Sequence, residues 1–135
     1  MIGKFGGLLY LIAFIVHFTC YAIYGFRCVF FTKSFLNHYG MDYSGAIITR
    51  FFGSLFIGSC TLAFYIMFFR DEGVALSNWG FFTLIFFQNL SVFIIGIYTI
   101  KINKLGHTSR TSIEGIIGPG ILTILSAIIA YGIVW

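Results

Sequence analysis

Few residues of this chain could do chemistry, and His17 is the first of them. It stands near the middle of an uncharged stretch that covers residues 6–26. Positions spaced by three or four residues share one face of a helix. The residues that share the face of His17 are aromatic: Tyr10, Phe14, Tyr21 and Tyr24. We expect this face to turn inward in a helical protein, with His17 at its centre.

Other polar residues stand near the middle of three further apolar stretches. When the four stretches are aligned by their ends, the residues at the depth of His17 are Thr61, Gln88, Asn89 and Ser126. A polar side chain surrounded by hydrocarbon is costly unless it is paired. This polar layer could bind a small ligand such as a quinone, a lipid headgroup, a proton or a haem shared with another subunit. It could instead join the helices by hydrogen bonds of about 0.6 kcal/mol each.

Hydrogen bonding between helices is the favoured interpretation of this layer, because no acidic residue accompanies His17 at that depth. A haem held by this chain alone would need two axial ligands that face each other. His17 is the only histidine inside an apolar stretch. The sequence therefore predicts no cofactor held by this chain alone.

Residues of metal-binding type occur in two connecting segments: His38, Asp42, His107 and Glu114. Zinc sites usually contain ligands that are close together in the sequence. Only His38 and Asp42 meet this condition, as an i, i+4 pair. We therefore expect solvated loop residues here rather than a metal centre.

Signatures of catalysis and nucleotide binding are missing from the sequence. It contains no HExxH, no GxxxxGK[ST] and no GxGxxG motif. The eight Lys and Arg residues are spread along the chain instead of forming a basic run, which argues against a nucleic-acid partner. These observations favour a protein that is not an enzyme.

The composition points to a membrane. Of the 135 residues, 59% are hydrophobic and only 9% are charged, whereas soluble domains carry about 25% charged residues. Four uncharged stretches, residues 6–26, 51–69, 79–100 and 115–135, approach or reach the length of helix that crosses a hydrocarbon core of about 30 Å. The sequence predicts an all-α integral membrane protein, a single domain (residues 1–135) built as an antiparallel bundle of four transmembrane helices.

The longest connection, from Cys28 to Thr49, mixes aromatic and polar residues at helical spacing. A segment of this kind can lie in the headgroup region of a bilayer. We expect a short interfacial helix here, with an irregular loop as the alternative.

The basic residues predict an orientation. Four crossings place both termini on one side, with Lys4 and Arg70. The other side holds the remaining basic residues: Arg27, Lys33, Arg50, Lys101, Lys104 and Arg110. Because Lys and Arg are enriched in cytoplasmic loops, we expect the first and third loops to face the cytoplasm, or its organellar equivalent, and the termini to lie outside.

The second apolar stretch carries a row of small and polar residues at helical spacing: Arg50, Ser54, Gly58, Thr61 and Tyr65. Ser54 and Gly58 form a small-x-x-x-small pair that lets another helix approach closely. The 18 Phe residues exceed what so small a core could bury, so many must face lipid or partner helices. The sequence favours an accessory, non-catalytic subunit of a larger membrane complex, with a small-ligand site around His17 as the alternative.

A resemblance to known proteins rests on two short motifs. Arg50-Phe51-Phe52-Gly53 opens a glycine-containing second helix, and Tyr131-Gly132 lies near the end of the chain. From Tyr39 onward the chain resembles the small uncharacterised four-helix membrane families related to DoxX. The resemblance implies a four-helix architecture and no activity, and no functional residue is carried over from it.

Overall fold

The computed structural model describes residues 1–71, 78–105 and 108–134, and all regular structure in these ranges is helical. The long helices are α1 (Leu8–Phe30), α3 (Ala46–Phe69), α4 (Trp79–Lys101) and α5 (Glu114–Val134). The short elements are η1 (Gly3–Phe5), α2 (Thr32–Tyr39) and η2 (Tyr43–Gly45). Within these ranges, four helices are long and apolar enough to cross a membrane. The predicted fold, a four-helix membrane bundle with a short helix after the first span, is confirmed.

Two helices extend beyond the uncharged stretches that predicted them. Helix α1 continues past residue 26, through Arg27, to Phe30, and α3 begins at Ala46, one turn before Arg50. A helix does not need to stop at a charge near the membrane surface, because a long basic side chain can reach the headgroups from inside the helix. The uncharged stretches therefore underestimate the lengths of these two helices.

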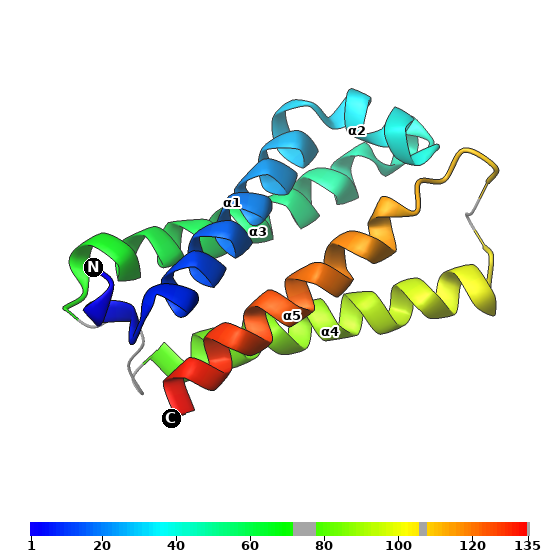
Figure 1. Cartoon of the computed structure of the whole chain (residues 1–135). Coiled ribbons are helices and arrows are strands. Elements are labelled where there is room, and N and C mark those ends of the chain that lie inside the picture. Colours follow the sequence, from blue (N-terminus) through cyan, green and yellow to red (C-terminus); the bar gives the residue numbers. More distant parts are fainter. Residues whose placement is uncertain (72–77, 106–107, 135) are drawn as a thin grey trace.

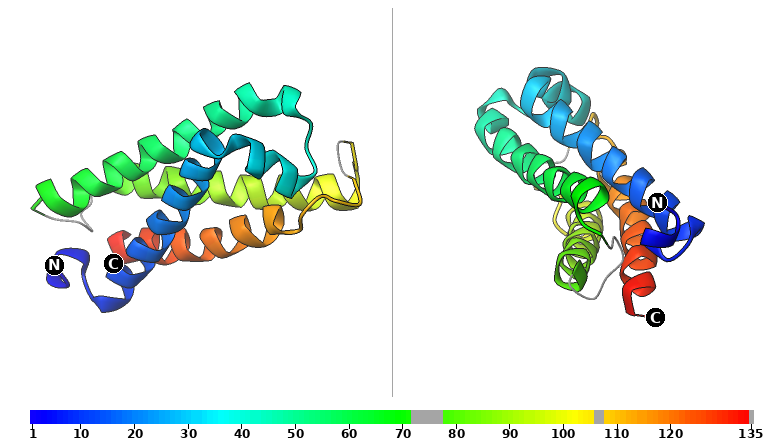
Figure 2. Two further views of the ribbon diagram at one scale, coloured as in Figure 1. Left: turned by 90° about the horizontal axis from the view of Figure 1, so that it is seen from above. Right: turned by 90° about the vertical axis from the view of Figure 1, so that its left-hand side faces the viewer.

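The bundle consists of two helical hairpins (Figure 1). Helix α1 packs against α3, α4 packs against α5, and the contact between α1 and α5 joins the hairpins. The first residues of α1 and the last residues of α5 lie at the same end of the bundle (Figures 1 and 2). In the most apolar part of α1, 39% of the residues are buried, whereas the share is 17% in each of the other three spans. Helix α1 is therefore the central helix.

Two glycines allow α1 and α3 to pack closely. A Cβ atom added at Gly53 would lie 2.5 Å from Cβ of Cys28, and one added at Gly25 would lie 3.1 Å from the carbonyl oxygen of Gly53. Small residues let transmembrane helices approach until their backbones touch. Gly25 and Gly53 serve this purpose here.

The core at the end that holds the N-terminus is aromatic. The ring centroid of Phe14 lies 4.7 Å from that of Phe5 and 6.0 Å from that of Phe82, so one side chain links η1, α1 and α4. Beside this cluster the ammonium group of Lys4 donates to the carbonyl oxygens of Met67 and Arg70. Carbonyls at a helix C-terminus lack intrahelical partners. Lys4 therefore caps α3 and closes this end of the bundle.

Candidate functional site

A hydrogen-bonded polar cluster lies in the middle of the bundle. It contains His17 and Tyr21 of α1, Asn89 of α4 and Ser126 of α5, all of them buried. Four bonds are made by Asn89 alone. Its Oδ1 accepts from the Tyr21 hydroxyl at 2.8 Å. Its Nδ2 has two hydrogens for three acceptors, His17 Nε2 at 2.9 Å, Ser126 Oγ at 3.2 Å and the Leu122 carbonyl at 3.4 Å, so one hydrogen is shared between two of them.

The hydrogen bonds determine which nitrogen of His17 carries the proton. The Leu122 carbonyl can only accept, so the amide nitrogen of Asn89 must be on its side. That nitrogen in turn can only donate, so His17 Nε2 must accept and the ring must be neutral, with its hydrogen on Nδ1. Nδ1 is buried and has no partner among the described residues. The imidazole therefore has one satisfied nitrogen and one unsatisfied N–H group.

Of the five residues predicted for the midplane layer, the structure brings together His17, Asn89 and Ser126. Thr61 is exposed on α3, and its hydroxyl donates to Ile57 O of its own helix at 2.9 Å. Gln88 is exposed on α4. Depth along the chain was therefore a sound guide to the layer, but depth alone does not say which face of a helix a residue occupies. Tyr21, which the layer also contains, was recognised only as part of the aromatic face.

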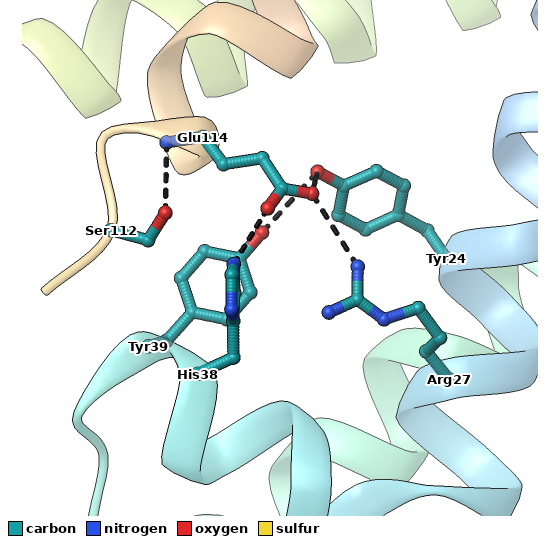
Figure 3. Close-up of polar contacts among 6 residues, drawn as sticks. All are labelled: Tyr24, Arg27, His38, Tyr39, Ser112 and Glu114. Carbon is teal, nitrogen blue, oxygen red and sulfur yellow. Dashed lines mark hydrogen bonds and ion pairs between the residues drawn. The ribbon is translucent and has the colours of Figure 1, made fainter.

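A second polar cluster surrounds Glu114 at the first residue of α5 (Figure 3). Its carboxylate accepts from the Tyr24 hydroxyl, from His38 Nε2 at 2.7 Å and from Arg27 Nη1 at 3.4 Å. The hydroxyls of Tyr24 and Tyr39 are 3.2 Å apart. Burial raises the pKa of Tyr39, so its phenol remains protonated and can donate. The cluster joins α1 and α2 of one hairpin to α5 of the other.

Of the four metal-type residues, the described structure brings together His38 and Glu114. The Asp42 carboxylate accepts from the Ser44 backbone N–H at 2.8 Å, which holds the pKa of Asp42 below its usual value. His107 lies outside the described residues. Among residues 1–71, 78–105 and 108–134, no group of three His, Cys, Asp or Glu side chains could hold a metal ion.

The sequence does not show that Tyr24, Arg27 and His38 share Glu114 as a partner. These residues belong to α1 and α2, while Glu114 is about 90 residues away. One signal was available. Glu114 is the only acidic residue adjoining an apolar stretch on the basic side of the chain, and a lone carboxylate among cations is expected to pair with them.

The outer faces of α3 and α4 carry small and polar residues. On α3, all five residues of the predicted row are exposed: Arg50, Ser54, Gly58, Thr61 and Tyr65. A Cβ atom at Gly58 would meet nothing within 4 Å. The predicted small-residue pair therefore faces away from the described part of the bundle, and Gly25 and Gly53 make the close contact inside it.

On α4, Gln88 and Ser91 are exposed on one face together with Leu84 and Ile95. Gln88 is close to the middle of the 23-residue helix. Its carboxamide forms no hydrogen bond with any residue that the structure describes, although its neighbour Asn89 forms four. A carboxamide at this depth requires a partner to satisfy it.

The chain was compared with protein families, curated proteins and solved structures, and no family model, no curated protein and no solved structure matches it. The resemblance to the families related to DoxX stays a prediction. The features that bear on function are the polar cluster around Asn89, the polar cluster around Glu114 and the outer faces of α3 and α4.

Proposed function

We propose that this protein is a non-catalytic accessory subunit that docks against other integral membrane subunits through the outer faces of α3 and α4. The observation that carries the proposal is the exposed row Ser54, Gly58, Thr61 and Tyr65. Lipid chains do not require a smooth, small-residue surface, but a helix that packs closely does. Gly58, with open space around its Cβ position, is where a partner helix could approach closest.

The outer face of α4 supports the same proposal. Exposed Gln88 near the middle of a span would leave two donors and an acceptor without partners in lipid. A partner helix can supply hydrogen bonds there, and polar side chains of this kind often join transmembrane helices. The apolar surface on these helices is ordinary for a lipid-facing protein. The polar and small positions within it are the features that lipid does not explain.

The second candidate is a small-ligand site at His17. Its support is the buried Nδ1–H group, which has no partner in the described ranges. The imidazole is 0% exposed, and its ring centroid lies 4.8 Å from that of Phe18 and 4.5 Å from that of Tyr21. A ligand could reach Nδ1 only if these rings moved. The geometry therefore favours subunit docking.

Mild detergent extraction, followed by sizing and absorption spectroscopy, tests both candidates. We expect the protein to elute with other membrane subunits and without a visible absorption band. Gly58→Trp should release the partners, because the indole would fill the space that a partner backbone needs. Ile124→Trp is the matched control, since Ile124 is 65% exposed near the middle of α5, away from the proposed docking faces.

Two results would overturn the docking proposal. One is a wild-type protein that elutes alone from its own membrane. The other is a Gly58→Trp protein that keeps its partners as well as the Ile124→Trp protein does. A coloured species that disappears in His17→Leu while the protein remains folded would favour the ligand site instead.

A further inference from the structure

Residues of α2 and of the first turns of α3 line a basic pocket. These elements lie at the end of the bundle opposite the N-terminus (Figure 1). The volume of the pocket is about 500 Å³, and its lining includes Lys33, Ser34, Asn37 and Arg50. None of the residues that line it is acidic. In the described part of the chain neither Lys33 nor Arg50 forms an ion pair with a carboxylate. The pocket therefore holds two positive charges that nothing described here neutralises.

The orientation of the Arg50 side chain is fixed. Its Nε donates to the Thr32 hydroxyl at 3.1 Å, and that hydroxyl donates in turn to the carbonyl oxygen of Cys28 at 2.7 Å. The terminal nitrogens of the guanidinium have no hydrogen bond to any described residue. A guanidinium anchored at one edge presents its remaining donors as a planar fork, which suits a phosphate group.

The neighbouring side chains add further donors. Asn37 Oδ1 already accepts from the Tyr43 hydroxyl at 2.9 Å, which leaves the Asn37 amide nitrogen available to donate. The Lys33 ammonium lies 5.7 Å from the centre of the Tyr43 ring. Every polar group that remains open in this pocket can therefore donate a hydrogen bond, and the two strongest donors are cations. Such a set is complementary to an anion with several acceptor oxygens.

An apolar groove begins at the same place. It has a volume of about 510 Å³, runs between α1 and α3, and shares Phe30 with the basic pocket. Ala22 and Phe26 line it on α1, and Ile57 and Cys60 line it on α3. From Arg50 to Cys60 is ten residues, or about 15 Å along a helix. That distance is about half of a hydrocarbon core of roughly 30 Å, the depth of one leaflet.

We propose that this paired pocket and groove bind one anionic phospholipid, with its phosphate between Arg50 and Lys33 and an acyl chain along the groove between α1 and α3. The headgroup must be anionic overall, because a choline or ethanolamine cation would be repelled by the two basic side chains. If the predicted orientation holds, the site opens to the cytoplasmic leaflet, where anionic lipids are concentrated. The groove includes Thr61 of the α3 row, but neither Gly58 nor Gln88 lines the pocket or the groove, so Gly58→Trp tests subunit docking without altering this site.

The full-length protein in a mild detergent tests the proposal by native mass spectrometry with two probes, phosphatidylglycerol and phosphatidylcholine with the same acyl chains. We expect phosphatidylglycerol to be retained preferentially. Arg50→Gln and Lys33→Gln should each weaken its binding about tenfold, because each removes a charged hydrogen bond. Lys101→Gln is the matched control, since Lys101 ends α4 at the same end of the bundle and does not line the pocket.

Two further measurements distinguish binding of the lipid headgroup from binding of the acyl chain. Ala22→Phe should weaken phosphatidylglycerol binding by narrowing the groove, whereas millimolar inorganic phosphate should not displace the lipid. Lys33 is exposed on a surface helix, so Lys33→Gln keeps the test available if Arg50→Gln fails to fold. Equal retention of the two lipids by the wild type would overturn the proposal. So would equal losses in Lys33→Gln and Lys101→Gln, or displacement by phosphate alone.

Discussion

Asn89 illustrates how a single residue can join three helices. Its carboxamide bonds to Tyr21 and His17 on α1 and to Leu122 and Ser126 on α5, while its own backbone belongs to α4. In lipid the hydrophobic effect does not hold helices together, so packing and hydrogen bonds must do so. Asn89 therefore contributes to the junction between the two hairpins, in addition to the contact of α1 with α5 and the packing of Phe14 against Phe82 of α4.

Replacing residues of this cluster should give a graded loss of stability. Asn89→Leu should lower the free energy of unfolding in detergent by about 1–3 kcal/mol, because it leaves the Tyr21 hydroxyl without its acceptor. His17→Leu should cost less, since it loses one bond and also removes the unpartnered Nδ1–H group. His17→Gln, which can keep a bond to Asn89, should cost least. The control is Gln88→Leu, which removes the exposed carboxamide of the residue before Asn89 and should not lower stability.

The opposite order of stability losses would contradict the view that Asn89 is the centre of the cluster. If His17→Leu destabilised the protein more than Asn89→Leu, the centre of the cluster would be the imidazole, as a ligand site would require. Measuring the four variants by denaturant titration under one set of conditions decides between the two orders.

The contact between His38 and Glu114 should contribute little to stability. The side chains are 43% and 36% exposed, and pairs this open to solvent typically contribute less than about 1 kcal/mol. A double-mutant cycle with His38→Gln and Glu114→Gln should give a coupling energy in this range that falls as salt is added. A larger coupling that is insensitive to salt would show that the pair is shielded from water by lipid or by a partner.

At the scale of elements, the contact between α1 and α3 depends on two glycines, Gly25 and Gly53. The same helix α3 carries Gly53 on the face toward α1 and Gly58 on the face away from it. Of the two, only Gly58 belongs to the small-residue pair that the sequence predicts. Their surroundings differ completely, because five residues correspond to about 500° of rotation, which places the two positions on different sides of the helix.

The pair Gly53 and Gly58 provides an internally controlled test. Gly53→Ala would put a Cβ atom 2.5 Å from Cβ of Cys28, so α1 and α3 must separate, and we expect a loss of about 1–3 kcal/mol in the free energy of unfolding. Gly58→Ala meets nothing within 4 Å and should leave the isolated protein as stable as the wild type, or slightly more stable. Equal effects at the two positions would mean that the α1–α3 contact differs from the one described.

At the scale of the molecule, the distribution of charge distinguishes the two ends. The end that holds α2 and the start of α5 carries most of the basic residues, and one carboxylate, Glu114, pairs with Arg27 there. At the other end, Lys4 is bound to carbonyls at the C-terminus of α3. A cation held by a helix C-terminus is partly neutralised by the local dipole. The two ends of the bundle therefore differ in positive charge by more than the count of basic residues alone suggests.

This contrast predicts the orientation in the membrane. Reporter tags fused to both termini should be found on the side opposite to Lys33 and Lys104, with the α2 end in the cytoplasm or its organellar equivalent. Adding two Lys residues after Met1 should increase the fraction of molecules in the reverse orientation. Cytoplasmic termini in the unmodified protein would contradict the prediction.

Composition and spacing determine much of this protein. The scarcity of charge, four stretches long enough to span and the amphipathic segment before residue 50 led to the fold class and to α2. Physical necessity explains this success, because a chain in hydrocarbon must satisfy its own backbone and a helix is the open-chain structure that does so. The depth of His17, Asn89 and Ser126 also follows from counting along a helix.

Tertiary structure decided which faces meet. It placed Gln88 outside and Asn89 inside, although they are adjacent in the sequence and of similar chemistry. It brought Tyr24, Arg27 and His38 to Glu114, and it turned Gly53 inward and Gly58 outward. The rotation of each helix about its axis depends on how all the side chains pack together. On helices that are apolar all round, the sequence pattern defines that rotation only weakly.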